Sequence, residues 1–247
     1  MKAFWKLFKN EWKLNVRDMN MVIFAIIMPL VVMVILGIIY GTRPAADGVS
    51  YTFMEQSLGP LCTISICAGG LMGLPILISD YRERKILKRF HVTPISPVML
   101  LGVEFAIYVA YSVISMVTLL LTSMLLWKVR LHGSWAAYLG SWLLTMVSTL
   151  SIGMMVGGIA KNAKSASVIA SILYFPMLIF SGTTLPLEVM PGAMRKIVSI
   201  FPMTQGIQLM KSVSLGLPAA SVWLPIAVMG AVTIICTGIS VRCFKWE

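Results

Sequence analysis

The chain has 247 residues, of which 58% are hydrophobic and only 12% are charged. Soluble domains contain about 25% charged residues, so this composition cannot build a fully water-exposed surface, and lipid must be the solvent for most of it. The net charge of +11 would indicate nucleic-acid binding in a soluble protein, but here we expect it to reflect cytoplasmic loops and contact with anionic lipid. We therefore expect membrane lipids, and no nucleic acid, among the partners.

Residues 1–18 predict an amphipathic helix that lies in the membrane interface. On a helical projection its basic residues share a narrow arc: Lys2, Lys6, Lys9, Lys13 and Arg17. Its aromatic residues share the opposite side: Phe4, Trp5, Phe8 and Trp12. Aromatic rings at headgroup level, with lysines turned to water, are typical of a helix in the interface plane. A solvated surface helix would not need four exposed aromatic residues.

Six uncharged apolar runs follow, and each reaches the length of about 20 residues needed to cross the hydrocarbon core. They are Met19 to Thr42, Gln56 to Ser79, Phe105 to Trp127, Gly133 to Ala160, Ser165 to Leu187 and Ser212 to Val241. The last span is expected to begin near Ser221. We expect no cleavable signal peptide, because the first run is long and no small-residue cleavage site follows it. The predicted fold class is all-α integral membrane, with six transmembrane helices.

The predicted organisation is a single transmembrane domain over residues 1–247. Its parts are the interfacial helix (1–18), spans one and two (19–79), an inner amphipathic helix (80–97), spans three to five (98–185), outer re-entrant helices (186–220) and span six (221–242). With the N-terminus inside, the inner segments hold fourteen Lys and Arg residues and the outer segments hold six. This excess predicts a multi-pass protein with both termini in the cytoplasm.

A few residues within the spans stand out. We expect Pro29 and Pro75 to bend the first and second spans. Gly153 and Gly157 form a G-x-x-x-G pattern, which permits close helix packing, including ordinary contact within one chain. Glu104 lies near the inner end of the third span, where we expect it to reach water; a proton-carrying role is the alternative.

The stretch from Asp80 to Pro97 predicts an amphipathic helix between the second and third spans. Its basic residues fall on one arc: Arg82, Arg84, Lys85, Lys88 and Arg89. Its apolar residues Ile86, Leu87 and Phe90, with Glu83 among them, fall on the opposite arc. Pro94 and Pro97 end the helix, because the residue before a proline is pushed out of the α region. The apolar arc suits docking to another protein, whereas the charge alone would suit a loop that only fixes topology.

The segment from Pro186 to Pro218 is too polar and too interrupted by proline to cross the membrane, yet too apolar for a solvated loop. Two short helices that dip into the outer leaflet, separated near Pro202, would satisfy both facts. Irregular backbone at that depth is tolerated only where protein or a wet cavity covers it. The segment is therefore expected to act as a lid over protein or over a wet cavity.

Motifs for several kinds of chemistry are absent from the sequence. There is no G-x-x-x-x-G-K-[ST] loop for nucleotide phosphates, no G-x-S-x-G elbow and no H-E-x-x-H. His91 and His132 would lie on opposite sides of the membrane, which excludes a shared metal. The cysteines are expected to be small buried side chains rather than disulfides or metal ligands; they are Cys62, Cys67, Cys236 and Cys243. We therefore expect no catalytic residues, metal or cofactor on this chain.

In its order of elements the chain resembles the membrane subunit of type-2 ABC transporters, the exporter permease family. The stretch DYRERKILKRFHVTPISPVMLLGVEF resembles the acidic–basic turn of that family, followed by Thr-Pro and a small polar residue, here Thr93, Pro94 and Ser96. The stretch FSGTTLPLEVMPGAMRKIVSIFPMTQGIQLMK resembles its Phe-Ser-Gly and proline-punctuated outer region, here Phe180, Ser181, Gly182, Pro186, Pro191 and Pro202. The resemblance covers nearly the whole chain.

The resemblance implies a permease of an ABC exporter in the plasma membrane, with a bacterial source expected. Two permeases, identical or related, would pair, and each would dock a separate ATP-binding subunit that carries the ATP and Mg²⁺. The helix at 80–97 would then be the coupling helix. Its implied docking residues are Tyr81, Arg82, Glu83, Arg84, Lys85, Ile86, Leu87, Lys88, Arg89, Phe90 and Pro94. The short outer segments disfavour family branches with a large external domain.

The family exports drugs, antibiotics, peptides, lipids, polysaccharides and, in some members, ions. Candidate cavity residues in the second and fifth spans are Thr63, Ser65, Met72, Tyr174, Phe175, Met177 and Phe180. Aromatic, thioether and hydroxyl groups suit an amphiphilic cargo, although each of these residues could equally serve only to pack helices. A secondary transporter or channel would be expected to show ionisable groups at mid-membrane or a repeat of broken spans, and neither is visible. A membrane anchor for an ATPase that transports nothing remains open.

Overall fold

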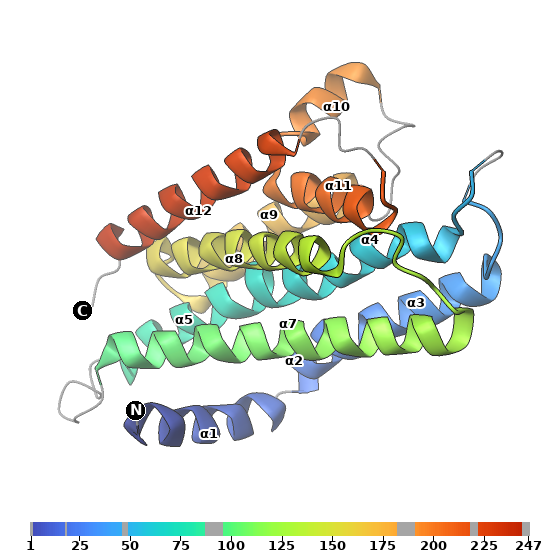
Figure 1. Cartoon of the computed structure of the whole chain (residues 1–247). Coiled ribbons are helices and arrows are strands. Elements are labelled where there is room, and N and C mark those ends of the chain that lie inside the picture. Colours follow the sequence, from blue (N-terminus) through green and yellow to red (C-terminus); the bar gives the residue numbers. More distant parts are fainter. Residues whose placement is uncertain are drawn as a thin grey trace.

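The computed structural model of the chain describes residues 2–17, 19–45, 49–86, 96–181, 191–217 and 222–243. In this described part, six helices are long and apolar enough to cross a membrane, as the six apolar runs predicted. Figure 1 shows them as a bundle of long helices.

The first and second spans are each assembled from three helical pieces. The first consists of α2 (Met19–Val22), the π-helical turn η1 (Ile23–Ile27) and α3 (Met28–Ile39). The second consists of α4 (Phe53–Cys67), the π-helical turn η2 (Ala68–Gly73) and α5 (Leu74–Glu83).

The other spans are single helices, and in the described part of the chain three shorter helices lie outside the six spans. The third to sixth spans are α7 (Pro97–Trp127), α8 (Trp135–Ile159), α9 (Ala163–Phe180) and α12 (Trp223–Cys243). The shorter helices are α1 (Lys2–Arg17), α10 (Gly192–Val198) and α11 (Pro202–Ser214).

The π-helical turns stand directly before the two prolines at which bends were predicted. Pro29 follows η1 at the start of α3, and Pro75 follows η2 at the start of α5. A proline has no N–H to donate to the carbonyl four residues earlier, and its ring clashes with that carbonyl. A wider turn moves the carbonyl away from the ring. The irregularity expected at these prolines therefore takes the form of π-helical turns.

The second and fourth spans form the centre of the bundle, and the first, fifth and sixth spans are mostly exposed along their sides. α8 packs against α4, α5, α11 and α12, while α7 packs against α1 and α4. The buried hydroxyls of α8 bond back to its own carbonyls: Thr145 to Ser141 at 2.7 Å and Thr149 to Thr145 at 2.8 Å. Such bonds satisfy polar groups inside a span without a partner helix.

The close approach of α8 to the second span depends on the glycines of the G-x-x-x-G pattern. A Cβ on Gly153 would collide with the carbonyl oxygen of Gly70 in η2, and a Cβ on Gly157 would lie 2.9 Å from Cβ of Ile78 in α5. The pattern thus serves helix contact within this chain. Cys62, Cys67 and Cys236 are buried and free.

The segment before the sixth span contains two short helices, α10 and α11, and Pro202 is the first residue of the second one. Most of α11 is buried against other helices, and a Cβ on Gly206 would meet the side chain of Thr145 in α8. In contrast, Ile197 of α10 is 63% exposed. Protein therefore covers α11, which is what the position predicted for it in the outer leaflet would require. The end predicted for the fifth span at Leu187 lies outside the described residues.

Candidate functional site at the end of the second span

The end of α5 is surrounded by the ends of several other helices. The start of α7, the junction of α8 with α9 and the helix α1 lie at the same end of the bundle (Figure 1). The stretch predicted to dock an ATP-binding subunit begins here. Its residues Tyr81 to Ile86 are described, whereas Leu87, Lys88, Arg89, Phe90 and Pro94 lie outside the described residues.

The predicted stretch is not one continuous helix. α5 ends at Glu83, Arg84 caps it, and Lys85 has a φ of 55°, which places it in the left-handed region. A left-handed residue cannot continue a right-handed helix. The helical arcs predicted across Lys85 therefore do not hold, and Glu83 and Ile86 do not share one helix face. Instead, Tyr81, Arg82 and Glu83 form the last turn of the second span.

Tyr81 joins α5 to both α1 and α7. Its hydroxyl lies 3.1 Å from Oε2 of Glu11 in α1 and 3.1 Å from Oε1 of Glu104 in α7. The amide of Asn15 donates to Oε2 of Glu104 over 3.3 Å. Glu104 is 0% exposed, so the expectation that it reaches water is wrong. It is buried because α1 and α5 cover this part of α7.

Arg82 joins α5 to the end of α8. Its two terminal nitrogens donate to the carbonyl oxygens of Gly158 and Ala160, each over 2.8 Å. α8 ends at Ile159, so these carbonyls belong to the last turn, where no intrahelical donor is available. A cation there also complements the negative end of the helix dipole.

Glu83 joins α5 to the start of α9. Its Oε2 accepts a hydrogen bond of 3.0 Å from the backbone N–H of Ala163, the first residue of α9. A carboxylate is favourable at a helix N-terminus, where backbone N–H groups are unsatisfied. Tyr81, Arg82 and Glu83 thus connect the end of the second span to α1, α7, α8 and α9.

The two residues after Glu83 face outward. Arg84 forms an ion pair of 2.8 Å with Asp80, and its side chain is 70% exposed. An exposed pair of this kind contributes little to stability. Lys85 is exposed, and Ile86 is half-buried against the main core. Among the described residues of the predicted docking set, Arg84 and Lys85 therefore present positive charge to the surface, whereas the exposed Glu83 is bound to the start of α9.

The predicted cavity residues are not all on one surface. Thr63 and Ser65 are buried, and the Thr63 hydroxyl donates to the carbonyl of Pro60 in its own helix over 2.6 Å. Phe175 is 53% exposed. Met72, Tyr174 and Phe180 are half-buried, and Met177 is buried.

The fifth and second spans nevertheless meet at this set. Met177 packs in one apolar cluster with Cys67 and Leu71 of the second span, and Tyr174 packs against that cluster. The Tyr174 and Phe175 rings meet edge to face, with centroids 5.4 Å apart.

Of the aromatic residues predicted to lie in the membrane interface, some pack against the protein and one is largely exposed. Phe8 and Trp12 stack with ring centroids 5.9 Å apart, and Trp12 stacks on Tyr111 of α7 at 5.3 Å. Phe4 is also half-buried against the core. Trp5 is 66% exposed, so of this group it most fully retains the expected outward position.

Sequence reasoning missed the buried polar group of Glu11, Asn15 and Glu104. A signal was available for α1: at about 100° per residue, Glu11 and Asn15 fall within the apolar arc of the helix rather than among its lysines. A carboxylate on an apolar face predicts a buried partner. Within the described residues, no three His, Cys, Asp or Glu side chains are grouped so as to hold a metal.

A family model described as ABC-2 type transporter matches residues 2–215. Nodulation protein J from Rhizobium leguminosarum bv. viciae is 30% identical over 86 residues, which make up 35% of this chain and 33% of that protein. The chain thus spans about a third of the length of this curated relative.

Proposed function

Because the chain belongs to the ABC-2 type transporter family, we propose that it is the membrane-spanning permease subunit of an ATP-driven exporter. The family and the six candidate spans make it a multi-pass membrane transporter subunit. In the proposal, two identical or related permeases form the membrane part, in a bacterial plasma membrane with their termini in the cytoplasm. Separate subunits bind ATP and Mg²⁺ and hydrolyse the ATP.

The observation that carries this proposal is the set of contacts made by the last turn of α5. Tyr81, Arg82 and Glu83 tie that turn to four other helices, and the predicted docking stretch continues directly from it. A subunit bound to the stretch would therefore act on α1, α7, α8 and α9 through α5. A loop that only retained positive charge on one side would not need these connections.

The contacts refine which residues dock. We assign to Tyr81, Arg82 and Glu83 the role of passing movement of the docked subunit on to the other helices. Their polar groups already bind other helices of the permease and are not available to the partner. The surface that contacts the ATP-binding subunit is assigned to the outward-facing Arg84 and Lys85 and to further residues implied by the family resemblance. Those residues are Ile86, Leu87, Lys88, Arg89, Phe90 and Pro94.

The test compares apolar truncation with charge removal in that surface. Phe90→Ala leaves every basic residue in place, so topology is expected to survive. A large apolar side chain buried at an interface contributes about 1.5–3 kcal/mol, so association with the ATP-binding subunit is expected to weaken by about 10- to 100-fold. Purified complexes would be assayed for subunit association and for cargo-stimulated ATP hydrolysis.

Ile197→Ala in α10 is the matched control, because it truncates an exposed apolar residue that is not part of the docking stretch. It is expected to leave subunit association unchanged. Association and stimulated hydrolysis at wild-type levels in Phe90→Ala would reduce the stretch to a loop that fixes topology.

The proposed cargo is an amphiphile, such as a drug, antibiotic, peptide or lipid. Its support is the apolar and aromatic surface where Tyr174 and Met177 meet the second span. Burying an isolated charge at the bilayer centre costs about 2.5–3.5 kcal/mol even on mild insertion scales, which disfavours a small ion there. Vesicles containing the complex would be tested for transport. Movement of only a metal or sodium ion, with no amphiphile altering ATP turnover, would contradict this cargo class.

A further inference from the structure

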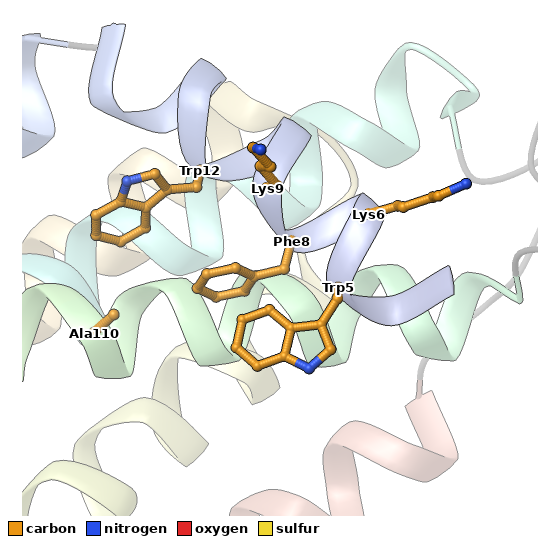
Figure 2. Close-up of a pocket in the computed structure, with 6 residues that line it drawn as sticks. All are labelled: Trp5, Lys6, Phe8, Lys9, Trp12 and Ala110. Carbon is orange, nitrogen blue, oxygen red and sulfur yellow. The ribbon is translucent and has the colours of Figure 1, made fainter. Parts of the chain in front are cut away.

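A groove of about 570 Å³ lies along α1 where this helix packs on α7. Figure 2 shows the residues that line it, which are Trp5, Lys6, Phe8, Lys9, Trp12 and Ala110. Its volume lies within the range of about 300–1,000 Å³ found for small-molecule pockets. None of the residues that line the groove belongs to the predicted docking set or to the residues proposed to contact cargo.

Aromatic rings form the groove wall, and their positions are fixed by one another and by α7. Trp5 meets Phe8 edge to face at 5.6 Å, and Phe8 stacks on Trp12 at 5.9 Å. Trp12 is in turn stacked on Tyr111 of α7. Ala110 contributes only a methyl group to the α7 side, which leaves room above that helix. The result is a preformed apolar surface of stacked rings.

The rim of the groove is positively charged. Lys6 and Lys9 line it with their aliphatic stems, and their amino groups point away from the rings (Figure 2). Neither lysine forms an ion pair with a carboxylate of the described residues. Glu11 is the one carboxylate within α1, and it is buried with its Oε2 bonded to Tyr81. The protein therefore supplies no counter-charge to these lysines from α1.

We propose that the groove binds one anionic phospholipid, with an acyl chain on the rings of Trp5, Phe8 and Trp12 and the phosphate held by Lys6 and Lys9. An apolar wall beneath a cationic rim matches the two ends of such a molecule. α1 ends at Arg17, and the first span begins at Met19. The groove thus lies beside the entry of the chain into the bilayer, where lipid headgroups are found.

Lipid retention by the purified full-length chain tests this proposal. The chain, in micelles that contain equal amounts of phosphatidylglycerol and phosphatidylcholine, would be examined by native mass spectrometry. The wild type is expected to retain one phosphatidylglycerol molecule in preference to phosphatidylcholine. Each lysine near an anionic membrane surface is worth about fivefold in binding. Lys6→Gln with Lys9→Gln is therefore expected to lower the preference by roughly 30-fold.

Two further variants separate the groove from general surface charge. Lys13→Gln with Arg17→Gln removes the same number of charges from the same helix outside the groove, and it is expected to keep most of the preference. Ala110→Phe fills the groove without changing charge, and it is expected to lower retention of both lipids.

Three outcomes would overturn the proposal. Equal loss of preference in the two double variants would mean that general surface charge attracts the lipid. Wild-type retention in both Ala110→Phe and the Lys6/Lys9 variant would mean that the lipid binds elsewhere. Loss of subunit assembly in the groove variants, with no lipid retained by the wild type, would mean that another protein chain covers the groove.

Discussion

Arg82 donates a hydrogen bond of 2.8 Å to the carbonyl oxygen of Ala160, and this contact fixes the end of the second span to the end of the fourth. The same guanidinium also binds the carbonyl of Gly158. The planar, forked geometry of arginine allows it to cap two carbonyls of one helix end at the same time. A lysine at this position would offer a single charged nitrogen.

Removing this cap is expected to destabilise the protein. Hydrogen bonds to charged groups contribute about 1.5–3 kcal/mol, so Arg82→Gln is expected to lower the unfolding free energy by about that amount. Arg84→Gln is the matched control, because its exposed ion pair is worth about 1 kcal/mol at most. Thermal unfolding of both variants in detergent would measure the difference. Equal midpoints would show that the Arg82 contacts contribute nothing beyond those of Arg84.

Tyr81→Phe is expected to loosen α1. The change removes the hydroxyl that lies between the buried carboxyl groups of Glu11 and Glu104, at a cost of about 1–3 kcal/mol. Hydrogen exchange of the backbone amides in Lys2–Arg17 would report the loss. Tyr138→Phe serves as the control: its hydroxyl is also buried, but it donates to the weak acceptor Cys62 Sγ over 3.6 Å. Unchanged exchange in α1 of Tyr81→Phe would show that Tyr81 does not hold this helix.

Gly153→Ala is expected to destabilise the packing of α8 on the second span. The added methyl group would meet the backbone carbonyl of Gly70, which cannot move away as a flexible side chain could. Overpacking of this kind costs about 1–3 kcal/mol. Gly140→Ala lies in the same helix with open space around its Cβ, so it is expected to be neutral or stabilising. The two unfolding temperatures give the comparison, and a Gly153→Ala variant as stable as Gly140→Ala would contradict it.

The orientation predicted from the charge distribution can be tested by labelling. Single cysteines would replace His132, Arg195, Arg84 or Lys161, all of them exposed, in a background without the native cysteines. Positions His132 and Arg195 are expected to react with an impermeant thiol reagent from outside the cell. Positions Arg84 and Lys161 are expected to react only after permeabilisation. External reaction at Arg84 would reverse the orientation and remove the basis for docking a cytoplasmic subunit.

The six spans could be predicted from sequence because each needs only a run of apolar residues, and such a run is visible without any partner. Local distortions at Pro29 and Pro75 could also be predicted, because a proline disturbs its own helix whatever packs against it. The interruption at Lys85 could not, because a lysine in the left-handed region is uncommon and carries no sequence signal. The docking stretch therefore looked like one helix.

The buried contacts at the end of α5 were also beyond sequence reasoning. Tyr81 and Glu104 are 23 residues apart in the chain, and Asn15 and Glu104 are 89 apart. Glu104 alone looked like a carboxylate near water, because nothing local shows that α1 and α5 cover it. Only the polar residues Glu11 and Asn15 on the apolar arc of α1 pointed to such a group.

The turn η2 also sets the rotational phase of everything that follows it in the second span. A π-helical turn accommodates one residue more than an α-helical turn, and each residue of an α-helix advances the chain by about 100°. If this turn closed into regular α-helix with all its residues kept, the last turn of α5 would rotate by about 100°, so Tyr81, Arg82 and Glu83 would all turn away from their partners. Deleting one residue between Ala68 and Gly73 as the turn closes would instead keep the last turn of α5 nearly in phase. The backbone form of one turn in the middle of the span thus decides whether contacts at its end can form.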